Sequence, residues 1–229
     1  QLVNIWTALE TLTPAQRTGH SKIANTTAAT LPFLLHAYTG RLVQQFTYDL
    51  LNWDKWRAKK LLHKVPCDPK TPMIGKSLRL LCLAENDGLR IQLYEHLKDF
   101  HLLRYRGFRL SEALSDRKKL RELIATHEKK VAWQIRRIYR TRNLIVHSGR
   151  NPPPYIDTLV ENGHDYLDTI IFEVMRISCG AYSATTIEQV FEIAKIRYQD
   201  FLRKLGQEVP FDRDNCSFLL GERAEITAE

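Results

Sequence analysis

The sequence has few of the residues that build disulfide frameworks, metal sites or phosphate-binding loops. Its four cysteines form no Cys-x-x-C pair and have no partner at zinc-finger spacing. Cysteines of this kind are typical of reduced thiols in a cytosolic protein. The ten glycines do not gather into a phosphate loop. We therefore expect no disulfide scaffold, no metal and no cofactor.

Long hydrophobic runs are also missing. The chain has no uncharged apolar run of about 18 residues and no charged-then-apolar leader, which argues against membrane spanning and secretion. A cytoplasmic protein without a membrane partner is predicted. The chain begins at Gln1, inside a helical pattern, and this indicates the C-terminal part of a longer protein.

Negative charge is scarce in one segment. Between Arg117 and Arg150 there are eleven lysines and arginines and only two glutamates, a net charge of +9. The remainder holds 23 basic and 24 acidic residues, so the excess positive charge lies in this segment. A basic stripe on an otherwise balanced protein is typical of a surface that binds a polyanion such as nucleic acid. A solvated charged helix face is the alternative.

Strand-like alternation is absent, whereas apolar residues recur at the three- and four-residue spacing of helices. We predict an all-α protein, a single domain over residues 1–229 whose helices pack as a bundle. A Thr-Thr-x-Glu pattern at residues 185–188 predicts a capping box. The expected helices cover about residues 1–13, 21–37, 42–62, 77–84, 89–103, 115–148, 166–182 and 185–205, and the tail from 207 is expected to be partly extended.

Two aromatic stretches lie in the first half of the chain. The string "YDLLNWDKW", residues 48–56, is predicted to belong to the core. The string "LLRYRGFR", residues 102–109, mixes arginine with aromatic residues and is a candidate RNA contact.

The basic segment ends in the string "RTRNLIVHSGR", residues 140–150. On a helix that advances about 100° per residue, Arg142 falls inside the apolar stripe. A charged side chain there is costly unless it is paired, so Arg142 lies either at the edge of the bundle or against a partner. The stripe consists of Val131, Ile135, Ile138 and Ile145.

The opposite face of this helix is polar and basic, and it carries Asn143 and His147 beside Arg136 and Arg140. The pattern suits cleavage of an RNA phosphodiester without a metal, because histidine can take the 2′-hydroxyl proton and arginine can stabilise the phosphorane. Flanking arginines favour a neutral His147 and a helix C-terminus favours a protonated one, and the sequence does not decide between them. A helix-capping histidine beside a solvated arginine is the alternative.

Arg142 and His147 are about 140° apart on an ideal helix. They converge on one phosphate only if the helix end is distorted or if two subunits contribute their copies side by side. We therefore expect a homodimer with the site at its interface.

Two strings resemble one known family. "YRTRNLIVHSG", residues 139–149, is similar to the signature of the HEPN superfamily, which is an arginine, a polar residue that is often asparagine, a few apolar residues and a histidine. The similarity is greatest to the Apea-like HEPN group, in which this string ends the third core helix. "LVNIWTALETL", residues 2–12, is similar to an earlier core helix that carries a tryptophan and a functional acidic residue, here Trp6 and Glu10.

The resemblance implies an up-and-down four-helix bundle that dimerises with its two motifs facing each other. The core helices would cover about residues 1–13, 115–148, 166–182 and 185–205, with residues 15–116 as a helical elaboration. The implied activity is that of a metal-independent endoribonuclease of bacterial toxin or antiphage systems, which cuts RNA such as tRNA and leaves cyclic-phosphate ends. Members of the group often carry a separate sensing domain, which is expected to precede this chain.

Carried over by position, Arg142 would bind or polarise the phosphate and His147 would act in acid-base catalysis. Asn143 would orient one of them, and Glu10 would position Arg142 or His147 at the cleft. A non-catalytic HEPN module that binds RNA or nucleotides or serves as a dimerisation platform is the second hypothesis, and an ordinary helical interaction domain is the third. The residues predicted to bind RNA are Lys129, Lys130, Arg136, Arg140 and Arg150.

Overall fold

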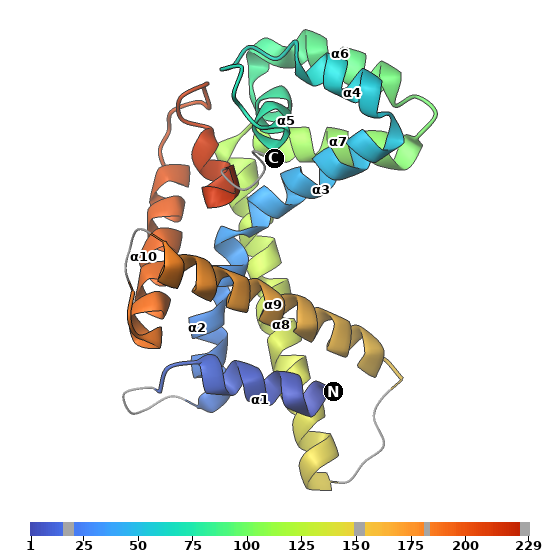
Figure 1. The fold of residues 1–229 in the computed structure, drawn as a ribbon. Helices are drawn as coiled ribbons and strands as arrows, with labels where there is room; N and C mark the ends of the chain where they lie inside the picture. The colour runs from blue at the N-terminus through green and yellow to red at the C-terminus, as the bar shows by residue number, and fades with distance from the viewer. Residues whose placement is uncertain (16–20, 149–153, 181–183, 225–229) are drawn as a thin grey trace. The chain divides into compact units, whose positions relative to one another are not determined.

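The computed structural model describes residues 1–15, 21–148, 154–180 and 184–224, and its regular structure is entirely helical (Figure 1). No strand occurs among these residues, so the all-α class is confirmed. None of the helices in these ranges is long and apolar enough to cross a membrane. The elements are α1 (Leu2–Leu12), α2 (Lys22–His36), α3 (Tyr38–Trp53), α4 (Lys55–Leu62), α5 (Met73–Cys82), α6 (Asp87–His96), α7 (His101–Leu114), α8 (Arg117–Ser148), α9 (Ile156–Cys179) and α10 (Ile187–Leu205), with 3-10 helices η1 (Ala84–Asn86) and η2 (Ser217–Ala224).

Several predicted helix boundaries differ from the observed ones. The helix expected over residues 42–62 is two helices, because Asp54 leaves helical geometry and its side chain accepts the N–H of Arg57, which caps α4. The helix expected over residues 89–103 is also wrong, since α6 ends at His96 and α7 begins at His101. Helix α9 begins well before the expected residue 166, and the described end of the tail is 3-10 helix, not extended chain.

The chain divides into two compact units. The first consists of Gln1–His36 and Ala125–Asp200, and the second consists of Ala37–Ile124 and Phe201–Glu229. Helices α8 and α10 each contribute residues to both units. All of the predicted site residues that the structure describes belong to the first unit.

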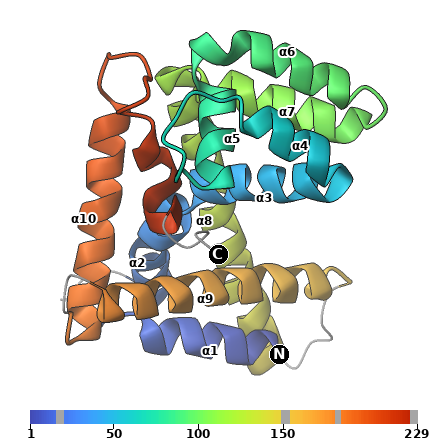
Figure 2. The ribbon, with the colours of Figure 1, turned by 45° about the horizontal axis from the view of Figure 1, so that its top comes forward.

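The first unit has one hydrophobic core, to which α1, α2, α8, α9 and α10 each contribute a face. Helices α1 and α9 lie side by side (Figure 2). They approach closely at Gly163, where a Cβ would lie 2.9 Å from Ile5 of α1 and 3.6 Å from Ile138 of α8. The missing side chain of Gly163 therefore lets three helices meet. The buried core residues are Leu2, Ile5, Trp6, Leu9, Phe33, Leu34, Val131, Ile135, Ile138, Leu159, Tyr166, Ile170, Ile177, Val190, Phe191 and Ala194.

Helix α10 begins with a capping box, as the sequence predicts, but with a different partner residue. The N–H of Gln189 donates to the Thr186 hydroxyl at 3.3 Å, and the Gln189 side-chain oxygen accepts the Thr186 N–H at 3.4 Å. The same oxygen accepts the N–H of Thr185 at 2.9 Å. The reciprocal pair is therefore Thr186 with Gln189, one residue later than the Thr-Thr-x-Glu reading.

The aromatic residues of the stretch 48–56 are exposed in the second unit, so their assignment to the core is wrong, although Leu50 of the same stretch is buried. Tyr48 is 62% exposed, Trp53 47% and Trp56 83%. The inward face of α3 is instead occupied by Val43, Phe46 and Leu50, which are fully buried. The helical spacing of apolar residues in α3 therefore indicates which residues are buried, whereas the high density of aromatic residues does not.

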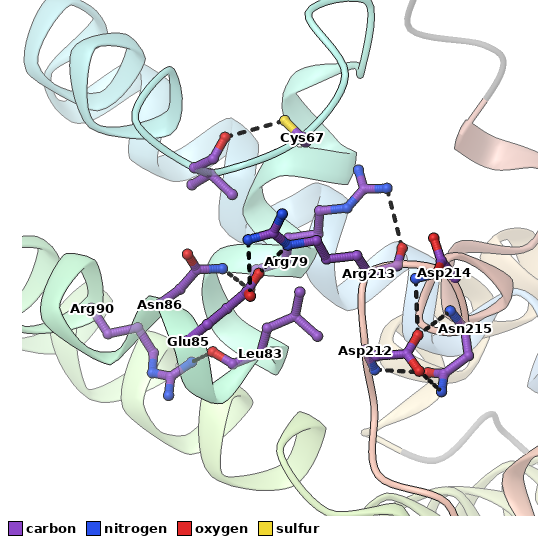
Figure 3. Close-up of polar contacts among 11 residues, drawn as sticks. Cys67, Arg79, Leu83, Glu85, Asn86, Arg90, Asp212, Arg213, Asp214 and Asn215 are labelled. Atoms are coloured by element: carbon purple, nitrogen blue, oxygen red, sulfur yellow. Dashed lines mark hydrogen bonds and ion pairs between the residues drawn. The ribbon is translucent and has the colours of Figure 1, made fainter.

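The C-terminal segment of the second unit is held by polar contacts to the region of α5 and η1 (Figure 3). The Arg213 guanidinium makes two hydrogen bonds with the Glu85 carboxylate, at 2.7 and 3.0 Å. These bonds lower the pKa of Glu85. Arg79 donates to the backbone oxygen of Arg213, and the side chain of Asn86 donates to that of Arg79. The segment is thus fixed by arginines that serve a structural purpose.

Candidate nucleic-acid interface on helix α8

Helix α8 presents one face to the core of the first unit and the other to solvent. Val131, Ile135 and Ile138 are 1%, 2% and 0% exposed, and Ile145 packs against the same core. The apolar stripe predicted from the sequence is therefore the buried face. Since α8 continues to Ser148 as an α-helix, the residues of the motif keep helical spacing.

Arg142 lies on this inward side and is partly buried. One Nη atom donates to the side-chain oxygen of Asn143 at 2.9 Å. Its Nε is buried and has no hydrogen-bond partner within the described part of the chain. A buried donor without a partner costs stability, so the position of Arg142 is not explained by packing.

His147 is exposed on the last turn of α8, and Asn143 is partly exposed one turn before it. Because the helix is regular here, Arg142 and His147 remain about 140° apart around its axis. Among the described residues no hydrogen bond joins His147 to Arg142 or to Asn143. In a single chain the two groups therefore point in different directions, and Asn143, which accepts a hydrogen bond from Arg142, makes no described bond to His147.

Glu10 occupies a defined place beside the motif. Its carboxylate accepts the indole N–H of Trp6 at 3.1 Å and pairs with Lys22 at 3.4 Å. Trp6 is fully buried and its ring packs on Tyr139 of α8, with centroids 5.0 Å apart and planes at 53°. Tyr139 lies one turn before Arg142. The two strings that carry the family resemblance are thus in contact, although no described bond joins Glu10 to Arg142 or His147.

The outward face of α8 carries the residues predicted to bind RNA. Lys129, Lys130, Arg136 and Arg140 are exposed, as the sequence predicts. With about 100° per residue, they lie within the same half of the helix surface as His147. Arg150, the fifth predicted residue, is outside the described residues.

Three further residues on this surface were not among the predicted site residues. The Arg137 guanidinium carbon is 4.5 Å from the ring centroid of Trp133 and 4.5 Å from that of Tyr155, which precedes α9. Trp133 is 56% exposed and Tyr155 48%. Cation–π contacts at exposed sites contribute about 0.5–1 kcal/mol each. The four-residue spacing of Trp133 and Arg137 on a helix could have indicated their contact. The local sequence contains no pattern that predicts the contact of Arg137 with Tyr155.

A metal centre and a cavity are two other ways in which the described chain could form a site. No group of three or more histidine, cysteine, aspartate or glutamate side chains in these ranges could hold a metal ion. A cavity of about 720 Å³ in the second unit includes Arg117, but this guanidinium donates to the backbone oxygens of Lys204 and Val209 and stacks on Phe211. None of the residues that line it belongs to the predicted site.

Comparisons with known proteins add nothing to this geometry. No family model, no curated protein and no solved structure matches the chain. A functional assignment therefore depends on the arrangement of the residues themselves and on the resemblance of the two strings.

Proposed function

We propose that the chain is a HEPN-type, metal-independent endoribonuclease that acts as a homodimer, as the effector of a bacterial antiphage or toxin system. Helix α8 would present the RNA-binding face, and the end of α8 would supply the catalytic groups. RNA, with tRNA as one candidate, is the proposed substrate, and a sensing domain outside this chain would restrain the activity.

The contact between Trp6 and Tyr139 is the observation that carries this proposal. It joins the two strings of the resemblance, which are far apart in the sequence, within one turn of Arg142. A chance similarity of two unrelated strings would not require them to pack together. The buried Nε of Arg142, which has no hydrogen-bond partner in the described chain, fits the same conclusion but does not carry it, because the Nε of Arg79 in the second unit shares this feature.

The proposed reaction transfers a phosphoryl group within the RNA strand. His147 takes the proton of a 2′-hydroxyl, whose oxygen then attacks the adjacent phosphorus. The bond from phosphorus to the 5′-oxygen breaks, and that oxygen takes up a proton, so the products are a 2′,3′-cyclic phosphate and a 5′-hydroxyl. Arg142 stabilises the extra negative charge of the phosphorane, and Asn143 holds the guanidinium through the 2.9 Å hydrogen bond.

A cleavage assay tests this proposal. The purified protein should cut RNA in the presence of a chelator and leave 2′,3′-cyclic phosphate ends. Loss of the acid-base group in His147→Ala should lower the cleavage rate by about 10²–10⁴-fold. His164→Ala is the matched control, because His164 is exposed on α9 in the same unit and should leave the rate unchanged. A requirement for a divalent metal, or full activity of His147→Ala, would contradict the proposal.

A non-catalytic HEPN module that binds RNA is the second candidate. It is favoured by one observation, which is that the described bonds of Glu10 go to Trp6 and Lys22 and none goes to Arg142 or His147. This candidate predicts salt-sensitive RNA binding without any product in the same assay.

A further inference from the structure

The exposed aromatic pair of Trp133 on α8 and Tyr155, the residue before α9, is not used by the proposed chemistry. Trp133 and Tyr155 come from different elements, yet both rings lie at 4.5 Å from the same guanidinium carbon, that of Arg137. About half of each side chain is open to solvent, 56% for Trp133 and 48% for Tyr155. Neither ring belongs to the core of the first unit, to which α8 contributes its opposite face.

The charge that α8 places beside Trp133 is positive. Residues 129–148 of α8 contain no aspartate or glutamate. Lys129, Lys130, Arg136 and Arg140 are exposed in the same stretch as Trp133. The nearest acidic residue to Tyr155 in the sequence is Asp157, in the first turn of α9. Cations beside open aromatic faces are the combination that binds single-stranded nucleic acid, since the cations contact phosphates and the rings stack on bases.

We propose that Trp133, Arg137 and Tyr155 form a base-stacking site for unpaired nucleotides, and that α8 therefore binds single-stranded RNA in preference to duplex. Bases inside a duplex have no free face to stack on a side chain, whereas an unpaired base has two. Arg137 holds both rings near one point of the surface, so that they are ordered before RNA arrives. Because stacking is available to every base, the site would show little sequence preference.

The position of the site bears on the length of RNA that is bound. Trp133 and His147 are fourteen residues apart on α8, which is about 21 Å along the axis. A stacked strand advances about 3.4 Å per nucleotide, so this distance corresponds to about six nucleotides. The base-stacking site would therefore hold the strand several nucleotides from the bond that is cut. In this respect the inference rests on the proposed function.

A binding experiment that does not depend on cleavage tests the inference. The probe is a fluorescent 2′-O-methyl RNA of about twelve nucleotides, which lacks the 2′-hydroxyl and is not cut, used single-stranded or annealed to its complement. Fluorescence anisotropy should show at least roughly tenfold tighter binding of the single strand. Trp133→Ala and Tyr155→Ala should each weaken single-strand binding by roughly tenfold, and Trp133→Phe should retain most of the affinity.

Salt dependence separates stacking from phosphate contact. Trp133→Ala removes no charge, so the slope of log affinity against log salt should not change. Arg140→Gln should instead reduce the magnitude of that slope by about 0.7 and weaken single-strand and duplex binding alike. Phe172→Ala is the matched control, because Phe172 is 45% exposed on α9 in the same unit and should leave binding unchanged.

Four results would overturn the inference. The first is equal affinity for single strand and duplex, and the second is unchanged single-strand affinity of Trp133→Ala. The third is a changed molecular mass of Trp133→Ala in solution, because the surface would then be a protein interface. The fourth is binding of the wild-type protein to anionic vesicles in place of RNA. Failure of the cleavage assay has a different meaning. It would remove the ribonuclease proposal while the preference for single strands could still be measured.

Discussion

At position 142, packing favours an apolar side chain, whereas the proposed function requires an arginine. The sequence places Arg142 among the apolar residues of α8, and the structure leaves its Nε buried without a partner in the described chain. A side chain chosen for packing at this position would be apolar. An arginine that lowers stability is therefore consistent with a residue retained for what it binds.

Replacing Arg142 with methionine should separate the two effects. Methionine is flexible and apolar, so it can fill the stripe while it removes the unpaired donor. We expect the free energy of unfolding to stay constant or to rise by about 1 kcal/mol, as measured by urea denaturation, while RNA cleavage is lost. A loss of stability of more than about 1 kcal/mol would show that the hydrogen bond to Asn143 has a mainly structural purpose.

The four cysteines should differ strongly in reactivity. Burial raises the pKa of Cys82 and of Cys216, and the Cys82 thiol also donates to the backbone oxygen of Leu114. Alkylation proceeds through the thiolate, so a raised pKa and a buried sulfur both slow it. At pH 8 iodoacetamide should modify exposed Cys179 first, and Cys82 and Cys216 only after denaturation. Peptide mass spectrometry measures the order in which the cysteines are modified, and early modification of Cys82 would contradict its burial.

At the scale of helices, the first unit depends on the close approach of α1 and α9. Gly163→Ala would place a methyl group 2.9 Å from the side chain of Ile5, so either that side chain or one of the two helices must move. We expect a loss of about 1–3 kcal/mol in the free energy of unfolding, measured by chemical denaturation. A shift of α1 would also move Trp6 relative to Tyr139, so we expect cleavage to fall with stability.

Gly88→Ala is the control for this substitution. Gly88 lies in the first turn of α6, and a Cβ there would meet nothing within 4 Å. Alanine is favoured over glycine in an open helical position, so Gly88→Ala should raise stability by up to about 1 kcal/mol. If both variants lost stability equally, the effect of Gly163→Ala would not come from helix packing.

Helix faces could be predicted from the sequence where the apolar spacing is regular, and the inward stripe of α8 is an example. The ends of the helices are harder to predict from the sequence, because they depend on single side chains. Asp54 interrupts an amphipathic run by capping the next helix, and Gln189 takes the capping role that Glu188 was expected to fill. The contact of Arg137 with Tyr155 joins two helices across a loop, and local spacing contains no information on it.

At the scale of the whole molecule, two of the three boundaries between the compact units give no signal in the sequence. The unit boundaries after Ile124 and Asp200 fall inside α8 and α10. Linkers rich in proline, glycine and polar residues mark domain boundaries in many proteins, but at these two boundaries the chain continues as a helix and has no such linker. The helices themselves were predictable from local periodicity, whereas their grouping depends on contacts between distant residues.

The proposed active site needs two copies of the chain, and mixing inactive variants tests this requirement. On one straight helix Arg142 and His147 are about 140° apart, so a working pair should combine Arg142 of one subunit with His147 of the other. Arg142→Ala and His147→Ala should each be inactive. When they are mixed and allowed to exchange subunits, half of the dimers are mixed and each has one complete site of two, which gives about one quarter of wild-type activity. Activity that stays at the level of the separate variants would mean that both groups act from the same chain. The end of α8 would then have to bend when RNA binds.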